Sequence, residues 1–178
     1  MRIVVDPGHG GKDPGAVRRW TPYKGLTEAE VVLDIGLDVR DRLVSLRHEV
    51  RMTRETDEFI SLSDRAAMGD GANLFVSIHA NAATSQSAQG TEVLYYSGSK
   101  QGRSCAEMIL RHLVHYMGLR SRGTKPRKNL AVLRRTKCPA VLVETCFISN
   151  PEEGMKLAIP EIRHSFAVAI VAGIEAYR

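Results

Sequence analysis

The chain has 178 residues, of which 43% are hydrophobic and 25% are charged, and its formal net charge is +5. This length is sufficient for one domain with a full-sized core, and the composition is that of an ordinary soluble globular protein. No apolar stretch approaches the roughly 18 residues of a membrane span, and the three cysteines lack the spacing of a disulfide framework or a metal site. The positive charge favours an anionic partner, which could be nucleic acid, a membrane surface or an anionic polymer.

The first half of the chain alternates predicted strands and helices. A β-branched run at 3–5 predicts a buried strand, and the polar, glycine-rich segment 12–26 predicts a long loop of the kind that is usually functional. Thr27 and Glu30 match a capping box, so we expect a helix to begin there and to run to about residue 47. There follow a strand at 48–52, a short helix opening at Ser61 or Ser63 and ending at 70–71, and a strand at 74–78.

The second half continues the same alternation. Its predicted elements are a strand at 91–96, an amphipathic helix at 100–117, a basic loop at 120–129, strands at 130–133 and 140–143, a short helix that starts at Pro151, and a last helix from about residue 160. Alternating strands and helices predict an α/β fold. We therefore expect a single domain over 1–178, with a mostly parallel twisted sheet and helices on both faces.

Three predicted strands each deliver a side chain that can bind a metal ion or move a proton. His9 follows the first strand within a glycine-rich turn, His79 follows the strand at 74–78, and Glu144 follows the last strand. The carboxyl ends of parallel strands lie along one edge of a sheet, where open α/β sheets place their ligands. Glu28 opens the first helix, and the long loop before it can return it to the same edge.

Two imidazoles, one carboxylate and a water molecule form a recurring catalytic zinc site, beside which a second carboxylate can transfer protons. Each residue alone has a plainer interpretation. A single histidine after a strand is more often a hydrogen-bonded structural residue, and an acid at a helix start complements the helix dipole. The turn also suggests a phosphate cradle, but the G-x-G-x-x-G and P-loop patterns are absent. Together, the four residues favour a metal site.

The segments that contain these residues resemble the zinc-dependent N-acetylmuramoyl-L-alanine amidases of the amidase-3 type. The resemblance begins with VDPGHGGKDPGA at 5–16 and covers nearly the whole chain. The other matching segments, in the order of the family, are 25–28, 52–54, 75–82, 90–93 and 141–150.

By this resemblance His9, Glu28 and His79 bind one zinc ion, and Glu144 is the general base. The substrate would be peptidoglycan, cut between the lactyl group of N-acetylmuramic acid and L-Ala. Zinc would lower the pKa of its water and polarise the carbonyl, while Glu144 would return the proton to the leaving amine. The capping box supports Glu28 over Glu30 as the ligand, because Glu30 has a local role at the helix start. Glu30 remains the alternative.

The sequence supports further predictions for residues near the motifs and for two other histidines. Arg65 and Asn81 accompany the site motifs and are expected to orient ligands or substrate. Only about twenty residues separate His79 from the next predicted helix, an ordinary length for a loop and a strand. Some relatives insert a regulatory helix there, so we expect an open cleft in this chain. His112 and His115 lie three apart on a predicted helix, but no third ligand accompanies them, and solvated histidines explain them better.

A basic run in the second half could bind nucleic acid, but it lacks interleaved aromatic residues and any nucleic-acid motif. An anionic wall polymer is a better partner for this run, and a solvated surface is the alternative. Its members are Arg120, Arg122, Lys125, Arg127, Lys128, Arg134, Arg135 and Lys137. We expect a monomer that acts on peptidoglycan, without a nucleic-acid partner or a membrane span.

Two other functions stay open. The chain could be a zinc carboxypeptidase or endopeptidase that cuts within the stem peptide, or a catalytically inactive wall-binding module, against which the retention of all four site residues argues. No secretion signal is recognised before the first strand, and no separate wall-binding domain is expected. The protein would therefore reach the cell wall, outside the cytoplasm, as a phage-type endolysin or as an excised domain of a secreted autolysin.

Overall fold

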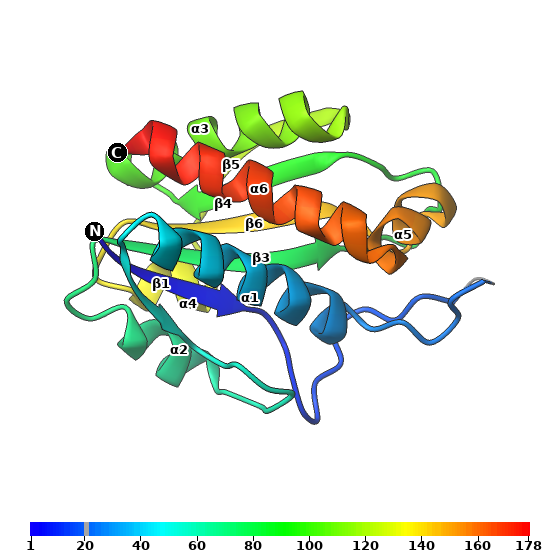
Figure 1. The fold of residues 1–178 in the computed structure, drawn as a ribbon, viewed down its shortest axis with the longest axis horizontal. Helices are drawn as coiled ribbons and strands as arrows, with labels where there is room; N and C mark the ends of the chain where they lie inside the picture. The colour runs from blue at the N-terminus through cyan, green and yellow to red at the C-terminus, as the bar shows by residue number, and fades with distance from the viewer. Residues whose placement is uncertain (20–21) are drawn as a thin grey trace.

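A six-stranded sheet forms the centre of the computed structural model, which describes residues 1–19 and 22–178. The order across the sheet is β2-β1-β3-β6-β4-β5 (Figure 1). The strands are β1 (Arg2–Pro7), β2 (Glu49–Met52), β3 (Leu74–Asn81), β4 (Thr91–Tyr96), β5 (Ser121–Arg127) and β6 (Ala140–Phe147). Strands β2, β1, β3 and β6 are parallel, whereas β4 is antiparallel to β6 and parallel to β5. The mostly parallel sheet is confirmed, and its direction reverses between β6 and β4.

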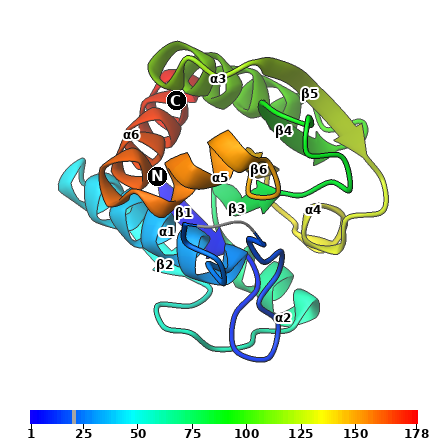
Figure 2. The same ribbon diagram turned by 90° about the vertical axis from the view of Figure 1, so that its right-hand side faces the viewer.

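Helices cover both faces of the sheet, as expected (Figures 1 and 2). On one face lie α1 (Glu28–Ser45), α3 (Lys100–Met117) and α6 (Pro160–Tyr177), and on the other lie α2 (Leu62–Met68) and α4 (Ala131–Arg135). The short helix α5 (Pro151–Ala158) lies near the end of the sheet toward which β1 and β3 point. Among the described residues no single helix is long and apolar enough to cross a membrane; α5 and α6 meet that test only as a pair bent by 91°.

The alternation of side chains along each strand produces two cores. Ile3 and Val5 face the larger core, which is closed by α1, α3 and α6, while Val4 faces the smaller core under α2 and α4. His79 and Glu144 share the alternation of Phe75 and Leu142, which belong to the smaller core. The catalytic candidates therefore lie on the α2 and α4 side of the sheet, where its apolar packing ends.

The start of α1 follows the sequence prediction. The side chain of Thr27 accepts a hydrogen bond from the backbone N–H of Glu30 at 3.2 Å, and Glu30 accepts one from the backbone of Thr27 at 2.9 Å. This reciprocal capping box fixes the first turn of the helix and leaves the side chain of Glu28 free to point elsewhere. At α2, Ser61 rather than Ser63 is the N-cap residue.

Two predictions in the second half are wrong. The segment expected as a loop at 120–129 contains strand β5, and the strand expected at 130–133 is replaced by helix α4. Gly123 and Pro126 weaken any local strand signal, but an edge strand tolerates proline, and pairing with β4 supplies the order. The run at 130–133 is short and apolar, and such runs do not distinguish a strand from a buried helical turn.

Candidate metal centre and active site

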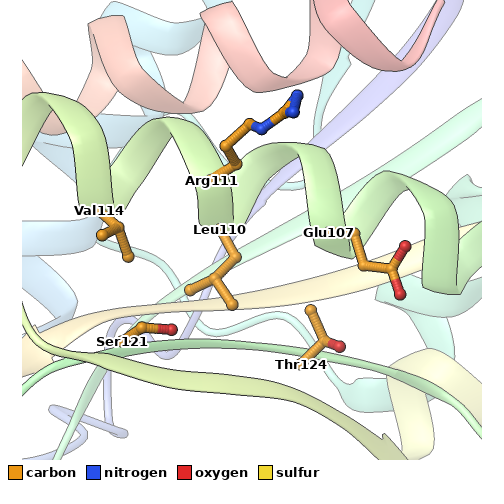
Figure 3. Close-up of a pocket in the computed structure, with 6 residues that line it drawn as sticks. All are labelled: Glu107, Leu110, Arg111, Val114, Ser121 and Thr124. Atoms are coloured by element: carbon orange, nitrogen blue, oxygen red, sulfur yellow. The ribbon is translucent and has the colours of Figure 1, made fainter.

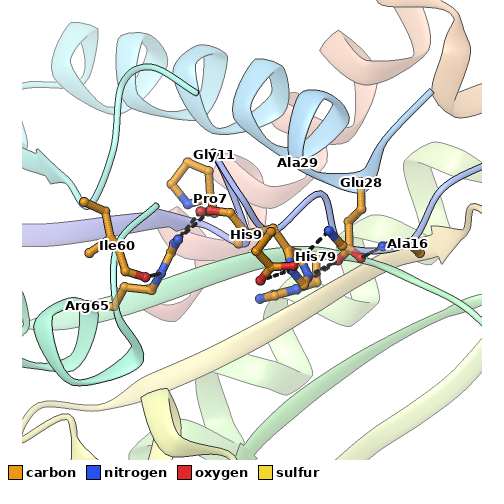
Figure 4. A network of polar contacts seen from close by, with 12 residues as sticks. Pro7, His9, Gly11, Ala16, Glu28, Ala29, Ile60, Arg65 and His79 are labelled. Carbon is orange, nitrogen blue, oxygen red and sulfur yellow. Dashed lines mark hydrogen bonds and ion pairs between the residues drawn. The ribbon is translucent and has the colours of Figure 1, made fainter. Parts of the chain in front are cut away.

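Three side chains from distant parts of the chain converge at the carboxyl ends of β1 and β3 (Figure 4). Oε1 of Glu28 lies 3.0 Å from Nε2 of His9 and 2.9 Å from Nδ1 of His79. The two imidazole rings meet edge to face, with their centroids 5.0 Å apart. The predicted ligands His9, Glu28 and His79 are therefore brought together, whereas the carboxylate of Glu30 contacts Thr27 in the capping box.

The backbone around Glu28 fixes its carboxylate. Oε2 accepts a hydrogen bond from the N–H of Ala16 at 3.0 Å, and Oε1 accepts one from the N–H of Ala80 at 3.1 Å. The loop before α1 reaches this position because an isolated bridge pairs Val17 with Thr27. Glu28 is only 5% exposed. Burial alone would raise the pKa of Glu28, but the two histidines outweigh it and lower that pKa far below its ordinary value.

His9 adopts a backbone conformation that non-glycine residues rarely use, with φ of 59°. Its Nδ1 lies 2.9 Å from Oδ2 of Asp13, so Nε2 is the nitrogen directed to Glu28. Burial would lower the pKa of His9, but hydrogen bonds and charges from Glu28 and then Asp13 raise it to about 9. Asp13 was not identified as a site residue from the sequence, although it lies within the motif at 5–16.

The donor set fits a zinc ion. Ligand bonds of about 2.0–2.2 Å in a tetrahedral site place ligand atoms a little over 3 Å apart, which is close to the observed separations at Glu28. Metal-bound histidines commonly donate their second N–H to a carboxylate, as His9 can to Asp13. The space beside the rings is also restricted, because a Cβ on Gly8 would lie 2.3 Å from the ring of His79.

Glu144 occupies the neighbouring strand, directly paired with His79 in the register of β3 and β6. Both residues lie inside their strands near the carboxyl ends, and not after them as the sequence suggested. Oε2 of Glu144 is buried and has no hydrogen-bond partner among the described residues. Burial, followed by the charges of Glu28 and Glu92, raises the pKa of Glu144 to about 7. A buried, unsatisfied carboxylate beside the cluster of His9, Glu28 and His79 (the metal group) is suited to a proton-transfer role.

Arg65 acts on the backbone of the His9 turn and does not point toward the metal group. Its guanidinium donates to Oδ1 of Asp6 at 2.8 Å, to the carbonyl of Pro7 at 2.7 Å and to the carbonyl of His9 (Figure 4). A second buried arginine was not identified from the sequence as a site residue: Arg54 donates to the carbonyls of Gly8 and Ala29, both at 2.8 Å. These arginines tie the turn that carries His9 to the helix that carries Glu28.

Asn81 points to a different neighbour. Its Nδ2 lies 3.4 Å from Oε1 of Glu92, which is the cross-strand partner of Glu144. The prediction that Asn81 orients ligand or substrate therefore stays a prediction. Nδ1 of His112 donates a hydrogen bond to the carbonyl oxygen of Met108 in its own helix, and no metal-binding group that includes His112 is found among the described residues.

One cavity is lined by His9 and His79, and a second lies beside Ala16, whose N–H donates to Glu28. One of about 460 Å³ is lined by Gly8, His9, His79 and a mainly apolar wall of Phe59, Ile60, Leu62, Leu130, Ala131 and Val132. The other, of about 740 Å³, lies along Ala16, Ala82, Thr84 and Ser149. The described part of the segment between His79 and α3 holds β4 but no helix, and the side chains of His9 and His79 are 23% and 19% exposed. The site can thus be reached from solvent.

Comparison with known proteins points to one family. The family model described as N-acetylmuramoyl-L-alanine amidase matches residues 3–176. The chain is 34% identical to N-acetylmuramoyl-L-alanine amidase AmiC of Neisseria meningitidis, with 98% of this chain and 52% of AmiC covered. It is 38% identical to N-acetylmuramoyl-L-alanine amidase LytC of Bacillus subtilis, with 98% of this chain and 35% of LytC covered. The chain therefore spans about half or less of the length of these two relatives.

Solved structures agree with the sequence comparison. The crystal structure of an N-acetylmuramoyl-L-alanine amidase from Clostridium difficile 630 superimposes with a TM-score of 0.92 at 31% identity, covering 99% of this chain and 95% of that one. The catalytic domain of CwlV from Bacillus (Paenibacillus) polymyxa gives a TM-score of 0.91 at 34% identity, covering 99% and 97%. With its fold and nearly its whole length matched, the chain belongs to the N-acetylmuramoyl-L-alanine amidase family.

Proposed function

We propose that the chain is a zinc-dependent amidase that hydrolyses the bond between the lactyl group of N-acetylmuramic acid and L-Ala of the peptidoglycan stem peptide. The observation that carries the proposal is the sharing of Oε1 of Glu28 by His9 and His79, with Glu144 on the next strand. Family membership supports the choice of bond, and the geometry supports a hydrolytic role for these four residues.

Each residue has a defined task in this reaction. His9, Glu28 and His79 would hold the ion, and Asp13 would keep the ring of His9 in the orientation that metal binding needs. Bound zinc supplies a Lewis acid that polarises the scissile carbonyl and lowers the pKa of a water molecule. Glu144 accepts the proton of the attacking water at its carboxylate and delivers it to the departing nitrogen of L-Ala.

The basic surface gives the protein a means of approaching anionic walls. Glu92 pairs with Arg122 and Lys125, and Asp70 pairs with Lys137, so long-range attraction of a polyanion falls mainly to Arg120, Arg127, Lys128, Arg134 and Arg135. The Debye length falls from about 10 Å at 0.1 M salt to about 3 Å at 1 M, so activity on intact walls should fall across that range. Cleavage of a small soluble substrate should change much less, because it does not depend on long-range attraction.

Product analysis on purified peptidoglycan tests the proposal. The expected products are free lactyl carboxyl groups and new L-Ala amino termini, both lost on treatment with a chelator and restored by zinc. Glu144→Gln should retain zinc and yield no product, whereas His79→Ala should lose both. New amino termini from residues other than L-Ala would identify a peptidase instead. Wall binding without new termini, in protein shown to contain zinc, would identify a binding module.

A further inference from the structure

A second charged group lies beside the proposed base. Glu92 is 6% exposed, and its Oε2 accepts hydrogen bonds from Lys125 Nζ at 2.5 Å and from Arg122 Nε at 2.9 Å. Oε1 receives only the long contact from Asn81. One carboxylate thus holds two cations, and the group has one positive charge in excess. Neutralising Glu92 would need only one of these cations.

The register of the sheet places this group next to the active site. Glu144 pairs with His79 on one side and with Glu92 on the other. Residues directly opposite in an antiparallel pair point to the same face, with Cβ atoms about 4.5–5.5 Å apart. The metal group, the proposed base and the cation-bearing carboxylate therefore follow one another on consecutive strands, about 4.8 Å apart.

A β-bulge directs the cations toward this face. Thr91 pairs with Ser121 and Val93 pairs with Thr124, so the strand β5 has one extra residue opposite Glu92. Ser121 and Thr124 lie beneath helix α3 and line a groove with Leu110 on that side of the sheet (Figure 3). Arg122, which lies between them, reaches Glu92 on the other side, where its guanidinium also covers the ring of Phe147 at 4.9 Å. Bulges commonly re-aim side chains next to active sites.

Both cations keep donors that are not engaged within the described residues. The Lys125 ammonium has one hydrogen bond there, and Arg122 adds a 3.3 Å contact from Nη1 to the carbonyl of Gln89. The two side chains are 30% and 32% exposed. Glu92 therefore holds two partly exposed cations in place while some of their N–H groups stay available, an arrangement able to bind an anionic group of a ligand.

We propose that Lys125 and Arg122 bind the α-carboxylate of the acidic residue that follows L-Ala in the stem peptide. The inference rests on the proposed function, since it takes the scissile bond to lie at the metal group. A carboxylate two residues beyond that bond lies about 7 Å away along an extended chain. Glu92 lies two strand spacings from His79, about 10 Å, and the long side chains of Lys125 and Arg122 reach back from β5 to Glu92 and can span the remaining distance. The reach of the peptide and the position of the cations agree.

The test compares two soluble muramoyl tripeptides, L-Ala-D-Glu-L-Lys and L-Ala-D-isoglutamine-L-Lys, both joined through the γ-carboxyl, so that only the α-carboxylate or its amide differs. The zinc-loaded wild-type protein should cleave the acid with a kcat/KM about five- to tenfold above that of the amide, mainly through KM, because hydrogen bonds to a charged group are at stake. Lys125→Met should remove most of this ratio, and Lys125→Arg should restore it. Lys100→Met, an equal charge change at the exposed start of α3, should leave it unaltered.

Each outcome has a defined meaning. A wild-type ratio near one overturns the inference and leaves the proposed amidase function standing, and this measurement requires no variant to fold. An unchanged ratio in folded Lys125→Met also overturns it. Failure of the wild type to cleave either tripeptide, when it is also inactive on purified peptidoglycan, overturns the proposed function and the inference together. If the wild type cleaves peptidoglycan but neither tripeptide, the same comparison on purified peptidoglycan with acidic or amidated stems decides the inference.

Discussion

Oε1 of Glu28 lies 3.0 Å from Nε2 of His9, although the whole loop 10–27 separates the two residues in the chain. The same helix start carries Glu30, whose carboxylate is used by Thr27. Two acids two residues apart thus have separate partners: Glu28 contacts the two histidines, and Glu30 serves the helix cap.

Glu28→Gln and Glu30→Gln form a matched pair that tests this division. Glu28→Gln should weaken zinc binding by more than the roughly 10- to 100-fold that loss of a supporting residue costs, because it removes a ligand. Glu30→Gln should bind zinc as the wild type does, since glutamine also serves in a capping box. Chelator competition measures both affinities. Equal losses in the two variants would show that the carboxylate of Glu28 has no special role.

Substitution of Gly15 tests how closely the loop before α1 packs on His9 and Glu28. A Cβ at this position would lie 2.7 Å from Oε2 of Glu28 and 2.7 Å from Cδ2 of His9, whereas a Cβ on Gly25 would meet nothing within 4 Å. Both glycines have positive φ, so alanine at either should cost about 1–2 kcal/mol in backbone strain. Only Gly15→Ala should also lower zinc affinity and activity. If Gly25→Ala impairs zinc binding equally, backbone strain and not contact is responsible.

Arg65 is expected to matter mainly through stability. It is 3% exposed and paired with Asp6, so Arg65→Met leaves a buried carboxylate without its counter-ion and should cost about 3–5 kcal/mol in the free energy of unfolding. Arg40→Met, which removes the surface pairs with Asp41 and Glu55, should cost at most about 1 kcal/mol. Denaturant titration of the zinc-loaded proteins measures both, and a cost below about 1 kcal/mol at Arg65 would contradict the buried ion pair.

Glu92 should make stability depend on pH. Burial would raise the pKa of Glu92, but Lys125 and Arg122 outweigh it and lower that pKa from its ordinary 4.5. Because the folded state favours the ionised form, the stabilisation is fully present above pH 4.5 and is lost as the pH falls through the lowered value. The gap in unfolding free energy between the wild type and Glu92→Gln should thus be about 1–2 kcal/mol near pH 7 and shrink below pH 4. A gap that is constant from pH 7 to pH 3 would contradict this assignment.

Much of the site could be predicted because its main residues lie where local patterns are strong. His9, His79 and Glu144 each accompany a β-branched apolar run, and parallel strands bring such positions to one edge. The capping box distinguishes Glu28 from Glu30 by a local sequence pattern alone. These inferences need only strand direction and helix-start chemistry.

The remaining features depend on tertiary pairing. Strand β5 contains Gly123 and Pro126 and exists because β4 lies beside it, while α4 forms from an apolar run too short to reveal its period. Glu92 and Arg122 lie at the starts of their strands, and they reach the active edge because the sheet reverses between β6 and β4. A search for polar residues at strand ends cannot find them, because the reversal has no local signature.

The reversal of strand direction between β6 and β4 also limits which parts of the site mutations can move. Loop lengths vary easily, but the separation between Glu144 and Glu92 is set by strand pairing, and a one-residue slip would turn every side chain of β4 to the opposite face. Val93 would then leave the larger core and Leu94 the smaller one. The spacing between Glu144 and the cations on Glu92 is therefore maintained by the same packing that keeps the domain folded. Point mutations can alter how strongly Arg122 and Lys125 bind a ligand. Their distance from the scissile bond can change only if the strand pairing of the sheet changes.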